Sequence, residues 1–314
     1  MQKLLVLTGP TAVGKTGLSL RLAKMLDGEI ISADSMQVYR GMDIGTDKIR
    51  PDQMEGIPHH LIDILDPREE FNIYRFQQEA VKAIEAISAR GHLPMLVGGT
   101  GFYIQSVLYR TRFAESDDNR DYRKELELRA EKLGAHALHE ELVTVDPASA
   151  AVIHENNVKR VIRALEYYHQ TGECISSHNE RERTREPAYD FRYYVLTDER
   201  EKLYERINVR VDQMIERGLE QEVRGLLALG LTGEEPSMQG LGYRQMTGYL
   251  KGEWSFGEAV DRIKRDTRHF AKRQLTWFRR ERDVFWLDRR MLQGDDAIIG
   301  RILADSWTTG KENP

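Results

Sequence analysis

Residues 9–16 of this chain read GPTAVGKT, a pattern whose residue types and spacing could bind phosphate. The segment follows the apolar run 4–7 and precedes residues 17–23, whose apolar positions have helical spacing. A glycine-containing loop between a strand and a helix turns backbone N–H groups inward, and the helix dipole adds partial positive charge. Lys15 supplies a full positive charge, and Thr16 places a hydroxyl within reach of a magnesium ion on the same phosphates. The segment therefore predicts a phosphate or diphosphate site.

Two further segments end predicted strands with residues that could take part in chemistry. Asp34 follows the predicted strand 29–32, and Thr100 ends the glycine-rich segment after the predicted strand 94–97. In a parallel sheet, ligands gather at the carboxyl ends of the strands, so these segments should converge with the phosphate loop. A carboxylate beside a phosphate can hold magnesium or accept a proton. A structural role as a helix N-cap remains an equally valid reading of Asp34 and Thr100 at this stage.

Residues 59–63 offer weaker candidates. Asp63 follows two apolar residues and could be a second acid of the phosphate site, but Asp66-Pro67 just beyond it fits a plain turn equally well. His59 and His60 are too isolated to make a metal site, which favours a structural or substrate-contact role.

The composition excludes several classes of protein. The 314 residues are 40% hydrophobic and 31% charged, without an apolar run of membrane-spanning length. The single cysteine, Cys174, excludes an internal disulfide and a cysteine-based zinc site. The chain leads from Met1 directly into the first predicted strand, so we expect no signal peptide and a cytoplasmic protein. Because the net charge is −5, any nucleic-acid surface must be a local basic patch.

Alternation of strands and helices predicts an α/β fold with a parallel, doubly wound sheet. Residues 1–114 and 189–314 form the predicted core with its C-terminal helices, and residues 115–188 form a charged α-helical insertion. The predicted strands are 4–7, 29–32, 60–64, 94–97, 191–196 and 284–287, and the predicted core helices are 17–23, 76–89, 102–108, 199–217, 219–229 and 256–281. In the insertion we expect helices at 121–134, 135–142 and 156–170, with an exposed connector at 179–187. We expect the tail 310–314 to be frayed.

Basic residues gather in two predicted helices, with Trp277, Phe278 and Tyr243 near them. A solvated helix face explains a single basic run, whereas two runs near glycine-rich segments also fit contacts to a phosphate backbone. Both readings stay open. The larger group is Arg262, Lys264, Arg265, Arg268, Lys272, Arg273, Arg279, Arg280 and Arg282, and the smaller is Lys159, Arg160 and Arg163.

Six motifs taken in order resemble the bacterial tRNA dimethylallyltransferase family over residues 3–288. They are GPTAVGKT at 9–16, ISADSMQVYRGMDIGT at 31–46, PHHLID at 58–63, VGGTGFY at 97–103, GLGYRQ at 240–245 and AKRQLTWFR at 271–279. The resemblance implies a nucleotide-kinase-like core, a P-loop sheet that holds a prenyl diphosphate and not ATP. It implies transfer of the dimethylallyl group from dimethylallyl diphosphate to the N6 amine of the adenine 3′-adjacent to the anticodon, position 37. The products would be N6-isopentenyladenosine and diphosphate, and the adenine must be flipped out to react.

The resemblance also implies roles for individual residues. Asp34 corresponds to the general base, and Thr100 to a threonine near the reacting groups. Arg210 would add charge at the leaving group, with Arg206 and Arg217 as competitors. The diphosphate would be held by Gly9, Thr11, Ala12, Val13, Gly14, Lys15 and Thr16, with Mg²⁺ at Thr16. The tRNA anticodon stem-loop would be held by Asp34, Ser35, Met36, Gln37, Thr100, Arg123, Lys159, Arg160, Val161, Ile162, Arg163, Gln239, Gly240, Leu241, Gly242, Tyr243 and Arg244. We expect a monomer without a membrane partner.

Three alternatives remain. A small-molecule kinase fits the phosphate loop alone, but the pairing of Asp34 with segment 98–100 and the basic last helix argue against it. A transferase that prenylates free adenine nucleotides is disfavoured by the long helical insertion. A non-enzymatic RNA-binding module is disfavoured by the intact Lys15-Thr16 pair and by Asp34.

Overall fold

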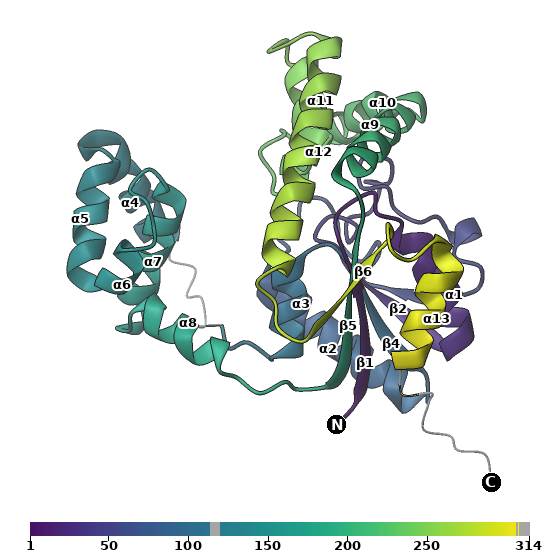
Figure 1. Ribbon diagram of the computed structural model, residues 1–314. Helices are drawn as coiled ribbons and strands as arrows, with labels where there is room; N and C mark the ends of the chain where they lie inside the picture. The colour runs from purple at the N-terminus through teal and green to yellow at the C-terminus, as the bar shows by residue number, and fades with distance from the viewer. Residues whose placement is uncertain (114–119, 306, 308–314) are drawn as a thin grey trace. The chain divides into compact units, whose positions relative to one another are not determined.

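A parallel sheet forms the centre of the larger of two units, which comprises Met1–Leu108 and Ala188–Pro314 (Figure 1). The computed structural model describes residues 1–113, 120–305 and 307. Within these residues the sheet has the strand order β3-β2-β4-β1-β5-β6, and all neighbouring strands are parallel. The strands are β1 Lys3–Thr8, β2 Gly28–Ala33, β3 His59–His60, β4 Leu93–Gly98, β5 Asp190–Thr197 and β6 Val284–Asp288. The predicted α/β class is confirmed.

Helices cover both faces of this sheet (Figure 1). The helices α1 Lys15–Leu26 and α13 Gly294–Asp305 pack on one face, and α2 Ile73–Ala89 and α3 Gly101–Leu108 on the other. The central strands are buried almost throughout, because a sheet covered on both sides has no solvated face. The segments that follow the carboxyl ends of β1, β2 and β4 line a cavity at this edge of the sheet.

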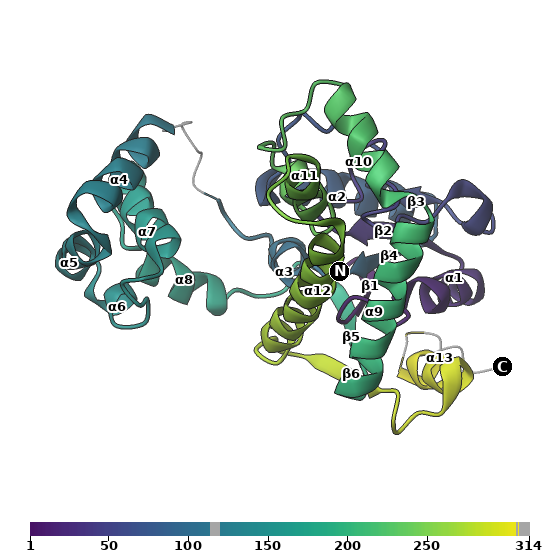
Figure 2. The same ribbon diagram turned by 90° about the horizontal axis from the view of Figure 1, so that it is seen from above.

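Further helices of the larger unit stand over that edge. They are α9 Arg200–Glu216, α10 Leu219–Ala228, α11 Tyr243–Leu250 and α12 Phe256–Phe278, with the short 3₁₀ helices η1 Pro51–Gln53 and η2 Ser237–Gln239. The long helix α12 packs against α11, α9 and α3 (Figure 2). Its start is well defined, because Ser255 and Glu258 form a reciprocal capping box. It ends at residue 278, three residues before the predicted end.

The second unit, Tyr109–Pro187, is helical and has its own core. Its helices are α4 Arg120–Leu133, α5 Ala135–Val145, α6 Pro147–Ala150, α7 Val158–Thr171 and α8 Ile175–Arg183. The core contains Leu126, Leu138, Leu142, Val161, Ile162 and Leu165. On α7 these apolar positions recur at helical spacing and leave the basic residues on the outer face.

Two predicted elements are wrong. The strand expected at 60–64 is limited to β3, because Leu61 (φ 62°) and Asp63 (φ 55°) have left-handed backbones that an extended strand excludes. The exposed connector expected at 179–187 is helical as far as the end of α8, since no glycine or proline interrupts it before Pro187. The tail 310–314 lies outside the described residues.

Candidate active site

The segment 9–16 forms the loop between β1 and the N-terminus of α1. Gly14 precedes the helix with φ 92°, and Gly9 has φ 144° with no room for a side chain. A Cβ at Gly9 would lie 2.5 Å from the carbonyl oxygen of Leu196. No side chain of the described residues caps α1 at Gly14, so its first N–H groups can serve an anion instead.

Lys15 points back into the loop. Its Nζ donates to the carbonyl oxygens of Gly9 (3.0 Å) and Pro10 (2.8 Å). Burial, together with the positive charge of Arg210, lowers the pKa of Lys15 to about 7. An anion bound in the loop would favour the charged ammonium, so the local electrostatics suit a phosphate ligand.

Arg210 on α9 reaches the same loop. Its Nη1 donates to Thr11 Oγ1 (3.0 Å), and its Nε lies 3.3 Å from Asp47 Oδ2. Arg217 also pairs with Asp47 (2.8 Å) but does not line the cavity beside the loop. Of the three arginines considered for the leaving group, Arg217 therefore lies outside the cavity at the phosphate loop.

Two other arginines hold the outer side of the loop. Arg206 Nε donates to the carbonyl oxygen of Ala12 (3.0 Å), and Arg289 Nε donates to that of Val13 (2.9 Å). Arg206 also lines the loop cavity, although its second partner, Asp198 (2.7 Å), partly neutralises it. Arg289 follows β6, and no sequence pattern around it indicates a contact with the phosphate loop.

Two cavities meet at Asp34. The first, of about 620 Å³, is lined by Thr11, Ala12, Gly14, Lys15 and Thr16 of the phosphate loop and by Gly98-Gly99, whereas the side chain of Val13 is buried in the core. The second, of about 310 Å³, is lined by Ser35, Met36, Thr100 and residues 239–243. The residues that line both are Thr11, Asp34, Thr46, Arg210 and Phe270. Asp34 thus lies between the cavity that contains the cationic phosphate loop and the second cavity.

The local backbone orients Asp34 and Thr100. Asp34 Oδ1 accepts from the backbone N–H of Met36 (2.8 Å), which fixes the carboxylate in the turn after β2. The Thr100 N–H donates to the carbonyl oxygen of Ala33 (3.2 Å), which ties the end of β4 to the end of β2. Gly98 permits this approach, because a Cβ there would lie 2.2 Å from the Ala33 oxygen. The three predicted segments are therefore adjacent.

Gln274 on α12 joins two of these segments. Its Oε1 accepts from the N–H of Thr11 (2.9 Å), and its Nε2 donates to the carbonyl oxygen of Gly99 (2.9 Å). The side chain is 5% exposed. Sequence reasoning missed this residue, although it lies in the motif 271–279, because its partners are 263 and 175 residues away.

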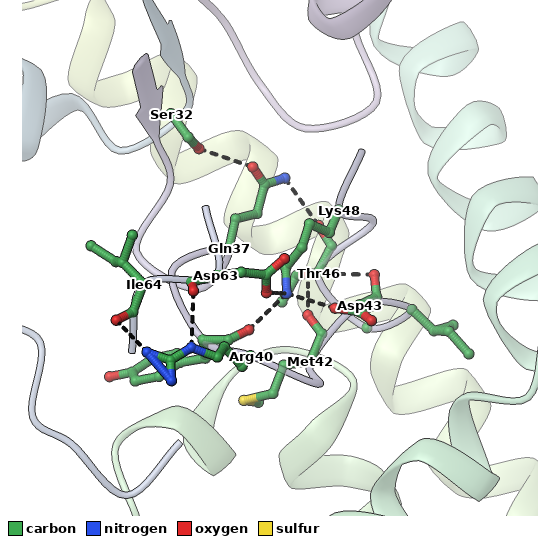
Figure 3. Close-up of polar contacts among 12 residues, drawn as sticks. Ser32, Gln37, Arg40, Met42, Asp43, Thr46, Lys48, Asp63 and Ile64 are labelled. Atoms are coloured by element: carbon green, nitrogen blue, oxygen red, sulfur yellow. Dashed lines mark hydrogen bonds and ion pairs between the residues drawn. The ribbon is translucent and has the colours of Figure 1, made fainter. Parts of the chain in front are cut away.

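Lys48 anchors the segment that follows Asp34 (Figure 3). Its side chain is 3% exposed, and Nζ donates to the Tyr39 carbonyl (2.7 Å), Asp43 Oδ1 (2.6 Å) and Asp63 Oδ1 (2.6 Å). Asp63 lines neither cavity, so the hypothesis of a second acid at the phosphate loop is wrong. Its carboxylate compensates the buried ammonium instead.

Gln37 connects this segment to the sheet (Figure 3). It accepts from Ser32 Oγ (2.9 Å) and donates through Nε2 to the Thr46 carbonyl (3.4 Å). Gln37 and Thr46 both line the first cavity, whereas Ser35 and Met36 line the second. The segment after Asp34 therefore contributes to both chambers.

Glu222 on α10 clamps the same segment from the other side. Its carboxylate accepts from the backbone N–H groups of Asp43 (2.9 Å), Ile44 (2.7 Å) and Gly45 (3.1 Å). Tyr243 Oη donates to it (2.7 Å). Burial, with Glu222 adjacent, raises the pKa of Tyr243 well above its usual value, so the phenol remains a donor. Together these contacts form the Glu222 clamp.

The residues predicted to contact tRNA are placed differently from one another. Tyr243 lines the second cavity, but its hydroxyl is committed to Glu222. Arg244 is exposed outside both cavities and pairs with Asp266 (3.3 Å). Of the two histidines, for which the sequence favours a structural or substrate-contact role, His59 lines the first cavity, whereas His60 binds Glu29 (2.7 Å).

In the second unit, part of the predicted RNA surface needs correction. Val161 and Ile162 are 0% and 3% exposed, because they lie on the core-facing side of α7, and their side chains cannot contact RNA. Lys159, Arg160 and Arg163 are exposed on the outer side. Arg123 forms a two-point contact with the buried carboxylate of Glu166 (2.7 and 2.6 Å), so part of its function is structural.

The donor set suits a magnesium ion held mainly by substrate. No group of three or more acidic, histidine or cysteine side chains that could hold a metal occurs among the described residues. Thr16 and Asp34 line the same cavity. Mg²⁺ commonly takes one or two protein oxygens and completes its shell with phosphates and water. In the part of the chain that the structure describes, no helix is long and apolar enough to cross a membrane.

Comparisons with known proteins agree over nearly the whole length. A family model described as IPP transferase matches residues 37–281, and one described as isopentenyl transferase matches residues 2–65. A tRNA dimethylallyltransferase of Lachnoclostridium phytofermentans is 55% identical, with 95% of this chain and 96% of the relative covered. Another, of Geobacillus thermodenitrificans, is 52% identical, with coverages of 91% and 90%.

Solved structures agree as well. The full-length tRNA isopentenylpyrophosphate transferase of Bacillus halodurans has a TM-score of 0.71 at 45% identity, covering 97% of this chain and 98% of that one. A eukaryotic dimethylallyltransferase, described as acting on tRNA, has a TM-score of 0.83 at 32% identity. The matched region covers 100% of this chain and 81% of the eukaryotic chain.

Proposed function

The chain belongs to the IPP transferase family, and on that premise we propose that it modifies one adenine of tRNA. It is a prenyltransferase that moves the dimethylallyl group of dimethylallyl diphosphate to tRNA. The acceptor in our proposal is the exocyclic N6 amine of the adenine 3′-adjacent to the anticodon. The products are N6-isopentenyladenosine and diphosphate, and we expect the enzyme in the cytoplasm with its tRNA.

The observation that carries this proposal is the meeting of two cavities at Asp34. One contains the phosphate loop and suits the diphosphate. The other, about 310 Å³, suits a single extruded base. A stacked adenine cannot bring its amine to a site at this depth, so it must be flipped out of the anticodon loop. Donor and acceptor would then approach each other from opposite sides of one carboxylate.

The chemistry follows from these positions. The adenine N6 attacks the allylic carbon, and a C–N bond forms while the C–O bond to the diphosphate breaks. The electron pair leaves with the diphosphate oxygen, whose charge is neutralised by Lys15, Arg210 and the N–H groups of the loop. Asp34 accepts the proton from N6, which keeps a cationic amine from forming. Thr100 lines the base chamber beside this proton transfer.

We further propose that Mg²⁺ is held by the Thr16 hydroxyl and the diphosphate oxygens. When bound, the ion adds positive charge at the leaving group. In the second unit, Lys159, Arg160 and Arg163 would contact the phosphate backbone of the tRNA, because they are exposed and unneutralised by ion pairs within the described residues.

The test is a direct assay of product and position. The protein is incubated with Mg²⁺, dimethylallyl diphosphate and an unmodified tRNA whose anticodon is followed by adenosine. The RNA is then digested and its nucleosides are identified by mass spectrometry. Isopentenyladenosine at that single position is expected. Product with AMP but not with tRNA would replace RNA by a free nucleotide as acceptor, and ATP turnover without either product would indicate a kinase.

A further inference from the structure

Arg289 contacts the phosphate loop from its outer side, and the proposed reaction does not use this residue. Its Nε donates to the carbonyl oxygen of Val13 (2.9 Å), and a Cβ at Gly14 would lie 2.9 Å from its Nη2. The guanidinium therefore packs against two consecutive residues of the loop, just before α1 begins. Arg289 lines neither cavity, so any effect on a bound ligand must pass through the loop.

The geometry of the peptide unit between Val13 and Gly14 gives this contact a consequence for anion binding. The unit is trans, so its C=O and its N–H point in opposite directions. Because Arg289 holds the Val13 oxygen on the outer side, the Gly14 N–H is turned to the inner side. Gly14 lines the first cavity, where a loop N–H attracts an anion. Rotation of this unit would present a carbonyl oxygen there instead, which repels an anion.

The loop needs such an external contact at this point. Gly14 has φ 92°, and glycine has no side chain that could restrain the rotation of its own backbone. The Val13 side chain is buried in the core, but its packing does not bind the carbonyl oxygen. The hydrogen bond from Arg289 is therefore the contact that sets the direction of this peptide unit.

Arg289 is itself held by the C-terminal segment of the larger unit. Its backbone N–H donates to the carbonyl oxygen of Thr197 (3.0 Å), which ties the end of β6 to the end of β5. Its Nη1 lies 2.9 Å from Asp295 Oδ1 in the first turn of α13. The helix α13 packs against α1 (Figure 1), and its Ile298 belongs to the same buried cluster as Leu18 of α1. The guanidinium is thus fixed between the loop and α13.

We propose that Arg289 presets the phosphate loop for the diphosphate, and that Asp295 orients Arg289 for this task. Arg289 is then a positioning residue, which keeps the Gly14 N–H directed at the anion site before the ligand binds. Without it, the loop would populate conformations that cannot bind, and the apparent affinity would fall with the fraction that remains competent. This inference rests on the proposed function, since it takes the loop to hold the diphosphate.

The first test compares two arginines that are adjacent in the sequence. Arg289→Gln removes the contact to Val13, whereas Arg290→Gln removes an exposed guanidinium that pairs with Asp288. Binding of inorganic diphosphate in the presence of Mg²⁺ is measured by isothermal titration calorimetry. The dissociation constant should rise about tenfold for Arg289→Gln, which loses a hydrogen bond from a charged donor, and hardly change for Arg290→Gln. Both variants lose one positive charge, so equal weakening would overturn the assignment.

Steady-state kinetics at saturating tRNA separate positioning from other roles of Arg289. A loop that is preset less often binds less well but reacts as before once it is occupied. The KM for dimethylallyl diphosphate should therefore rise about tenfold in Arg289→Gln, while kcat stays within about twofold. A fall in kcat at unchanged KM would indicate support of the fold or contact with the leaving group, and it would contradict a positioning role.

Asp295 offers a test in which charge and position predict opposite results. Asp295→Ala removes an acid near the loop, so an effect of charge alone would tighten the binding of inorganic diphosphate. If Asp295 orients Arg289, binding should instead weaken by about threefold, in keeping with a partly exposed ion pair. Asp296→Ala is the matched control, because this neighbour in the first turn of α13 pairs with Arg21. Tighter binding by Asp295→Ala would overturn the orienting role.

The outcomes distinguish this inference from the proposed function. If the unchanged protein makes isopentenyladenosine but Arg289→Gln binds inorganic diphosphate as well as Arg290→Gln does, the positioning role is wrong and the function stands. If the unchanged protein makes no product with tRNA, yet Arg289→Gln and Asp295→Ala bind inorganic diphosphate more weakly than their controls, Arg289 presets the loop and the function is wrong.

Discussion

Arg210 and Arg217 both pair with Asp47, but only Arg210 also reaches the phosphate loop. A cation aimed at the developing charge of a leaving group contributes far more to the rate than an exposed one. Arg210→Gln should lower kcat/KM for dimethylallyl diphosphate by about 10²–10³-fold. Arg217→Gln removes an exposed ion pair and should lower it by no more than about fivefold. Steady-state kinetics at saturating tRNA make the comparison, and equal losses would contradict this assignment.

Asp34 lines both cavities, and its role as the base can be separated from a role in docking. Asp34→Asn keeps the shape and an oxygen that can still accept from the Met36 N–H, but the amide cannot take a proton. The kcat should fall by roughly 10²–10⁴-fold. The tRNA dissociation constant should hardly change. Single-turnover kinetics and tRNA binding measure the two quantities, and a parallel loss of both would show that Asp34 serves docking.

At the scale of the elements, the sequence is informative where the interacting groups are neighbours. Strand β1, the phosphate loop and the start of α1 are one continuous segment, so composition and spacing predict their geometry. Gln274 and Glu222 escaped prediction because each binds backbone groups more than 170 residues away. Backbone groups carry no residue-specific signal, and only the folded arrangement reveals such contacts.

Short irregular segments and faces of helices were the other source of error. The predicted strand at 60–64 failed because left-handed residues follow β3, a property that apolar composition does not encode. Val161 and Ile162 were grouped with basic neighbours in sequence, although a helix turns by about 100° per residue and carries them to the core. The charged side of α7 is predictable only when this period is applied residue by residue.

The Glu222 clamp links α10 to the segment that carries Asp47, which in turn holds Arg210. Glu222→Ala leaves three backbone donors and the Tyr243 hydroxyl without their acceptor. We expect the free energy of unfolding to fall by about 2 kcal/mol. If the clamp positions Arg210, kcat/KM for dimethylallyl diphosphate should also fall roughly ten- to hundredfold. Denaturant unfolding and steady-state kinetics provide the two readouts.

Tyr243→Phe is the matched control for the clamp. It keeps the ring against Gly45 and removes a single hydrogen bond, so stability should fall by about 1 kcal/mol with little kinetic effect. A Glu222→Ala protein that loses stability but keeps its kinetics would mean that the clamp supports the fold without positioning Arg210.

The molecule as a whole consists of two units with separate cores. The residues proposed for the chemistry all belong to the larger unit, while the exposed basic residues of α7 belong to the helical one. A negative net charge is compatible with RNA binding because α7 and α12 each carry a local group of basic residues. Because the cores are separate, we expect a destabilising substitution in one unit to leave the other unit folded.

Asp146 is the residue at which this locality can be tested. It is 1% exposed and accepts four hydrogen bonds, two from Ser149 and two from Ser176, which secure the starts of α6 and α8. Burial alone would raise the pKa of Asp146, but these bonds outweigh it and lower the pKa. A carboxyl with a lowered folded-state pKa contributes stability above its unfolded pKa of about 4 and loses it as the pH falls through the folded value.

Asp146→Asn should therefore destabilise the helical unit by on the order of 3 kcal/mol near pH 7, because the amide turns N–H donors toward the serine donors. Hydrogen exchange of the full-length protein, read peptide by peptide, should show lost protection within residues 120–183 and none in β4 or α2. The exposed Glu131→Gln serves as the control for loss of charge. The difference between the Asp146→Asn and unchanged proteins should begin to shrink as the pH drops below about 4, the unfolded pKa, and should be smallest below the lowered folded-state pKa, where Asp146 itself is protonated. Loss of protection spreading into the sheet would show that the two cores unfold as one.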